Sequence, residues 1–83
     1  MTTFENIQDI ITIKEVMDQA LSNLYEGKSY NREIDVFGKE VFVYTEERHF
    51  GAEVIITSTQ LDFAYVLDNS NSTQSEIIEA LIK

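Results

Sequence analysis

Hydrophobic and polar residues alternate through the middle of the chain, from Asn31 to Leu67. A period of two is typical of β-strands that bury one face in a core. Turn-forming residues interrupt the alternation at Gly38, at Gly51 and at the polar stretch 58–60. The middle of the chain therefore predicts four antiparallel strands joined in a meander.

Residues 31–47 read as the first hairpin, with its turn at Gly38-Lys39. A two-residue loop with glycine first suits a type II′ turn. This register pairs Val36 with Val41 and Ile34 with Val43. The second turn falls within 46–51, the third strand is expected over 52–57 and the fourth over 61–67.

The segments on either side of the meander carry a helical period. From Phe4 to Glu26 the apolar residues recur at three- and four-residue intervals, and Gly27 follows as a C-terminal stop. This segment fits one long helix, or a short N-terminal piece followed by a break near 11–13 and a main helix from Ile13. The β-branched run 10–13 resists helix and favours the second form. A last helix is expected after a cap at Ser72 or Thr73.

The predicted order is α-β-β-β-β-α, an α+β fold. The chain has 83 residues, which is the size of one domain, and we expect a single domain over 1–83. Hydrophobic residues make up 43% of the chain and cysteine is absent, so packing rather than disulfides must stabilise the fold. One sheet face is expected to form the core and to be covered by at least one helix; it holds Ile34, Val36, Val41, Val43, Val54, Ile56, Leu61, Phe63, Tyr65 and Leu67.

The other face of the predicted sheet mixes large apolar side chains with carboxylates. It collects Glu33, Asp35, Phe37, Glu40, Phe42, Tyr44, Glu53, Ile55, Asp62, Ala64 and Val66. Three interpretations fit this mixture. The last helix or an N-terminal segment covers part of the face, two copies pair through it, or a different protein binds there. In the third case the rings supply contact area and the acids select a basic partner.

Charge narrows the classes of partner. Fifteen acidic and six basic residues give a formal net charge of −9. Phosphate backbones and anionic membrane surfaces are repelled by such a protein, so we expect no direct binding of nucleic acid or membrane. A basic protein, often itself a nucleic-acid-binding protein, is a better candidate for the partner than a nucleic acid or a membrane. The plainer explanation is that the charge keeps a small protein in solution.

The acids of the first helical segment allow a related interpretation, because acids spaced along a helix imitate a row of phosphates. The residues concerned are Glu5, Asp9, Glu15, Asp18 and Glu26. A solvated helix face is the more common explanation.

No residue pattern indicates an enzyme or a cofactor. His49 is the single histidine and lies in a turn between Arg48 and Phe50, without a residue nearby in the sequence to orient it as a general base. No spacing of histidines or carboxylates predicts a metal site. The start of the chain has no signal-peptide pattern and no stretch is long enough to span a bilayer, so a cytoplasmic protein is expected.

The leading functional hypothesis is a non-enzymatic protein-binding module. It docks on a basic site of a nucleic-acid-binding protein and acts there as an acidic inhibitor or nucleic-acid mimic. The alternative is a housekeeping or structural domain that forms a homodimer through the same mixed face. The residues predicted to contact the partner are Glu33, Asp35, Glu40, Phe42, Tyr44, Glu46, Glu47 and Glu53.

Two resemblances accompany these hypotheses. The order of segments, with Tyr65-Val66-Leu67-Asp68-Asn69 followed by Ser75-Glu76-Ile77-Ile78-Glu79-Ala80-Leu81, resembles the small YkuJ-like proteins over roughly residues 10–82. That family has no assigned function, so the resemblance implies only the fold. By size and charge the chain also looks like phage-encoded inhibitors of the anti-CRISPR or anti-restriction type.

Overall fold

The computed structural model describes residues 4–48, 51–59, 64–67 and 71–82. Six elements follow one another in the described chain, in the predicted order α-β-β-β-β-α, and the α+β class is confirmed. Their bounds are α1 Phe4–Tyr25, β1 Asn31–Val36, β2 Lys39–Arg48, β3 Gly51–Ser58, β4 Tyr65–Leu67 and α2 Asn71–Ile82. The strands form one antiparallel sheet in the order β1-β2-β3-β4, which is the expected meander.

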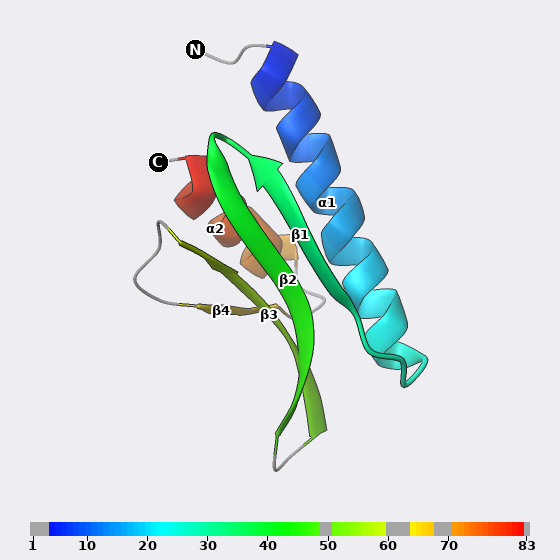
Figure 1. Ribbon diagram of the computed structural model, residues 1–83. Helices are drawn as coiled ribbons and strands as arrows, with labels where there is room; N and C mark the ends of the chain where they lie inside the picture. Colours follow the sequence, from blue (N-terminus) through cyan, green and yellow to red (C-terminus); the bar gives the residue numbers. More distant parts are fainter. Residues whose placement is uncertain (1–3, 49–50, 60–63, 68–70, 83) are drawn as a thin grey trace.

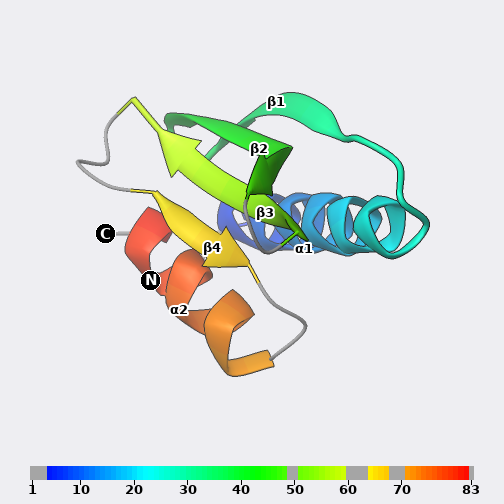
Figure 2. The ribbon, with the colours of Figure 1, turned by 90° about the horizontal axis from the view of Figure 1, so that it is seen from below.

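Helices α1 and α2 lie on the same side of the sheet. Figure 1 shows α2 behind the strands and α1 alongside β1, and Figure 2, seen from below, shows the sheet arching over both helices. Helix α1 packs against β1, β2 and β3, whereas α2 packs against β4. The molecule therefore has two layers, and neither of these helices covers the opposite face of the sheet.

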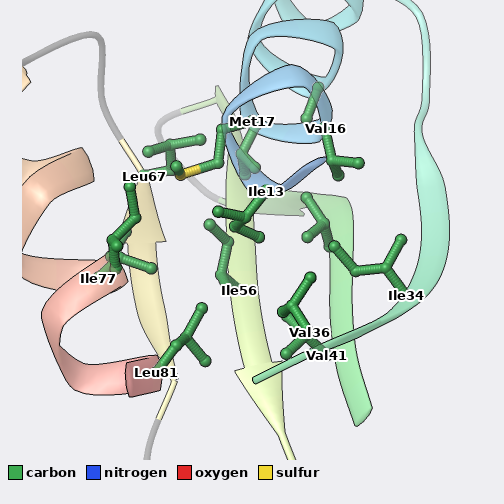
Figure 3. Packing of buried hydrophobic residues seen from close by; sticks show 14 of the residues in the cluster. Ile13, Val16, Met17, Ile34, Val36, Val41, Ile56, Leu67, Ile77 and Leu81 are labelled. Atoms are coloured by element: carbon green, nitrogen blue, oxygen red, sulfur yellow. The ribbon is translucent and has the colours of Figure 1, made fainter. Parts of the chain in front are cut away.

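The core fills the space between these two layers. Ile13 and Met17 of α1 and Ile77 and Leu81 of α2 are fully buried, and Figure 3 shows them directed toward Ile56 of the sheet. The strand residues of this cluster all belong to the predicted core face; they are Ile34, Val36, Val41, Val43, Val54, Ile56 and Leu67. The alternation in the sequence thus identified the correct buried face.

Helix α1 is continuous, and the expectation of a break near residues 11–13 is wrong. Ile13 is fully buried in the core cluster, one turn before Met17 on the same side of the helix. Burial of a large apolar side chain contributes about 1.5–3 kcal/mol, which exceeds the few tenths that a β-branched residue costs in a helix. Tertiary packing therefore outweighs the local preference of this run.

The first hairpin turns one residue earlier than predicted. Its loop is Phe37-Gly38, with φ of 55° and 73°, and Val36 pairs with Lys39 and Ile34 with Val41. Positive φ at both loop residues is the mark of a type I′ turn rather than type II′. Because the pairing shifts by two residues, every strand residue keeps its predicted face. Phe37 is the exception, since it leaves the outer side and packs against the core.

Each helix makes a polar contact with this turn. The backbone N–H of Phe37 donates to Oδ2 of Asp9 in α1 at 2.8 Å. The Nζ of Lys39 donates to the carbonyl oxygen of Leu81, near the end of α2, at 2.7 Å. A cation at a helix C-terminus satisfies a carbonyl that lacks a partner within the helix. The turn therefore links the sheet to both helices at one end of the molecule.

Two sequence-based expectations fall at least in part outside the described residues. They are the turn containing His49 and the first three residues of the expected fourth strand, 61–63. The described part of that strand is Tyr65–Leu67, with Ala64 preceding it. Helix α2 begins at Asn71, before the cap expected at Ser72 or Thr73. In the part of the chain that the structure covers, neither helix combines the length and apolar character that a bilayer crossing requires.

Candidate functional site on the outer face of the sheet

The outer face is defined here as the side of the sheet opposite the helices. Three rows of paired residues cross it. Asn31, Tyr44, Ile55 and Val66 form the row across all four strands, and Glu33, Phe42 and Thr57 form the row beside it. The third row is the pair Asp35 and Glu40. Strands β2 and β3 continue at the other end to Glu46 and Glu53, which also pair.

The apolar centre of the outer face is only partly open. Ile55 is 2% exposed although it lies outside the core cluster, and it stands between Tyr44 and Val66 in the register. Phe42 and Tyr44 are partly buried, whereas Val66 is 49% exposed. The rings thus act in part as a shallow second packing layer. A partner would contact their edges and Val66 rather than fully exposed aromatic faces.

One corner of the outer face, formed by Glu33, Asp35 and Glu40, is called the acidic corner. All three residues are exposed. Asp35 stands directly opposite Glu40 on the neighbouring strand. Like charges in this position destabilise a sheet. Within the described residues none of the three carboxylates takes part in an ion pair or a side-chain hydrogen bond. The corner is therefore a concentration of uncompensated negative charge.

The basic residues next to the acidic corner in sequence do not neutralise it. Arg32 directs its Nη1 to Oε1 of Gln19 in α1 at 3.2 Å. Lys39 reaches the carbonyl oxygen of Leu81 in α2. Both side chains thus point to the helix side of the sheet, because neighbouring strand residues alternate between faces. The alternation of the strands therefore places the basic side chains on the helix side and the carboxylates on the outer face.

A second group of acids lies at the far end of the outer face. Glu46 pairs with Glu53 where β2 and β3 extend beyond β1 and beyond the described part of β4. Glu46 lies six positions after Glu40 along β2, which corresponds to about 20 Å in an extended strand. Carboxylates therefore occupy both ends of the outer face, and the apolar row lies between them.

Seven of the eight predicted contact residues share the outer face, and Glu47 does not. By the alternation of β2, Glu47 faces the helix side, since Glu46 is directed to the outer face. The hollow at this end of the strand is lined by Leu24, Thr45 and Ala52 together with both Glu46 and Glu47. Asn31 and Thr57 also lie on the outer face, although the mixed face predicted from the sequence did not include them. The same period of two would have included both.

The acids of α1 do not form a continuous row. Asp9 is partly buried and accepts the Phe37 N–H, so it serves the fold. Glu26 follows the helix and lies 3.7 Å from Nζ of Lys28. Among the acids of α1 with described side chains, only Glu15 and Asp18 remain exposed. The outer face therefore carries the denser arrangement of carboxylates.

Comparison with known proteins adds no assignment. No protein-family model matches the chain, and no match is found among curated proteins or among solved structures. The interpretation of the outer face therefore depends on its own geometry and charge.

Proposed function

We propose that this protein is a non-enzymatic binding module whose outer face docks on a basic site of another protein. The class of partner is a nucleic-acid-binding protein, because its basic site is built to accept phosphates. An acidic surface that occupies such a site excludes the nucleic acid and acts as an inhibitor. Long-range attraction speeds the encounter, and contact of Val66 and the ring edges stabilises the complex.

The observation that supports this proposal most strongly is the pair Asp35 and Glu40. The two residues stand in a non-hydrogen-bonded position of the ladder, where opposite side chains approach most closely. A like-charged pair lowers the stability of the free protein by a few tenths to 1 kcal/mol. A basic partner would turn this unfavourable pair into a favourable contact. The pair does not favour folding, which supports a role for it in binding.

Neutralising one member of the pair should raise the stability of the protein and weaken its binding of a basic peptide. In Glu40→Gln we expect the free energy of unfolding to rise by about 0.5 kcal/mol at low salt, because repulsion with Asp35 disappears. The same variant should bind a lysine-rich peptide more weakly than wild type. Denaturant unfolding and isothermal titration calorimetry, each at low and high salt, measure the two effects.

Glu47→Gln is the matched control, because it removes the same charge from the same strand on the other face of the sheet. It should leave both quantities close to their wild-type values. If Glu40→Gln and Glu47→Gln weaken peptide binding equally, only the net charge matters and the outer face has no special role. Absence of any binding of the peptide at low salt contradicts the proposed function.

A further inference from the structure

The free edge of β1 offers a second kind of contact, made by the backbone. Strand β1 is the first in the order β1-β2-β3-β4 and has no strand on its other side in the described sheet. The N–H of Thr45 donates to the carbonyl oxygen of Tyr30 at 2.9 Å, which places Tyr30 in a hydrogen-bonded pair. Hydrogen-bonded and non-hydrogen-bonded pairs alternate along an antiparallel ladder. Arg32, Ile34 and Val36 therefore direct their backbone groups to β2.

The residues between them direct their backbone groups away from the sheet. Asn31, Glu33 and Asp35 present N–H and C=O groups at the open edge, and all three are exposed. Among the described residues no partner is found for these groups. A row of unpaired backbone groups with a strand's spacing is a template for another strand. The edge can thus accept an extended segment.

The side chains of this edge decide which segment fits. A second copy of β1 added antiparallel would bring Glu33 and Asp35 against the same carboxylates of its partner. Like charges directly opposite destabilise such a pair. A segment with lysine or arginine at these positions would gain attraction instead. Edge charges that prevent self-association are a known device of sheet proteins.

We infer that the edge of β1 binds an extended, basic segment of the partner protein by strand addition. The inference rests on the proposed function and specifies how the partner is held. Alternate side chains of the added strand would lie on the outer face beside Glu33 and Asp35, and these should be basic. The intervening side chains would lie beside Arg32 and Ile34 on the helix side, and these should be uncharged. The recognised pattern is therefore basic residues two positions apart.

Glu33→Pro tests the backbone contact. Proline removes the N–H that faces the open edge, and it is tolerated in an edge strand where that N–H makes no ladder bond. Glu33→Ala removes the same carboxylate and keeps the N–H. The probe is a peptide of about eight residues in which lysine alternates with threonine or valine. We expect Glu33→Pro to bind it up to about tenfold more weakly than Glu33→Ala, which is the upper end of the effect of losing one hydrogen bond.

Methylated peptides keep the test independent of the folding of the proline variant. In an antiparallel pair the residues opposite Glu33 and Asp35 direct their own N–H groups to β1. N-methylation of the lysines should therefore abolish binding to the wild-type protein. N-methylation of the intervening residues should leave binding nearly unchanged, since those N–H groups point away.

The outcomes separate the two proposals. If both methylated peptides bind alike and Glu33→Pro equals Glu33→Ala, strand addition is refuted while charge-dependent docking on the outer face stands. If no lysine peptide binds at low salt, both proposals are refuted. If the wild type sediments as a dimer that Glu33→Pro dissociates, the edge is occupied by a second copy and the inference is overturned.

Discussion

Replacement of Ile56 by alanine should lower the free energy of unfolding by about 3 kcal/mol. Ile56 is fully buried in β3, where it pairs with Val43 and Tyr65. Figure 3 shows its side chain among Ile13 of α1 and Ile77 of α2. Truncation would leave a cavity where both helices meet the sheet, which the rigid strands cannot close. For a domain of this size the melting temperature should fall by about 15 °C, as measured by circular dichroism.

Val66→Ala is the control for the assignment of faces. Val66 lies on the neighbouring strand, on the outer face, and it is 49% exposed. Its truncation should cost less than about 1 kcal/mol, because water already reaches the side chain. Equal losses in Ile56→Ala and Val66→Ala would show that the outer face is buried as deeply as the core face.

Among substitutions in the protein, reversing the charge of the acidic corner should have the largest effect on binding. In the double variant Asp35→Lys, Glu40→Lys, each exposed contact loses about 0.5 kcal/mol of attraction and gains a similar repulsion. The total of about 2 kcal/mol corresponds to roughly thirtyfold weaker binding of the lysine peptide at low salt. The difference should shrink as salt screens the charges. Calorimetric titrations over a salt series measure both quantities.

The double variant Glu15→Lys, Asp18→Lys controls for net charge. Both residues are exposed on α1, and the substitutions change the formal charge by the same amount on the opposite side of the molecule. We expect at most a few-fold loss of affinity. A loss as large as that of the acidic corner would mean that the peptide senses the whole molecule and not the outer face.

The division of the sheet into two faces could be predicted from the sequence because it depends only on a period of two. Val41 and Val43 alternate with Phe42 and Tyr44, and this assigns each residue to a face whatever the exact pairing. A register shift of two residues left the assignment unchanged. The same property made seven of the eight predicted contact residues share one face, and it placed Glu47 on the other.

The position of the first turn could not be predicted, because it depends on contacts distant in sequence. A bulky residue at positive φ is unfavourable by about 1–2 kcal/mol, so the local sequence argues against a loop at Phe37. The structure compensates through the Asp9 carboxylate, which accepts the Phe37 N–H from 28 positions away, and through packing of the ring on the core. Neither contact can be recognised from the residues next to the turn in the sequence.

The sequence also could not predict that the outer face is free of both helices. The pattern of residues permitted a helix on either side of the sheet, and only the arrangement of α1 and α2 shows that both pack on one side. Partial burial of Phe42 and Tyr44, and full burial of Ile55, depend on how strongly the sheet curves. Alternation alone carries no information on that curvature.

Binding of the lysine peptide through β1 and the outer face can be followed by backbone amide chemical shifts of the isotope-labelled protein, recorded during titration with this peptide at low salt. We expect the shifts to concentrate on β1 and on the outer-face residues of β2, and the amides of Asn31, Glu33 and Asp35 to gain protection from hydrogen exchange. Shifts that cluster instead on the exposed side of α1, around Ile7, Ile11 and Tyr25, would contradict this expectation.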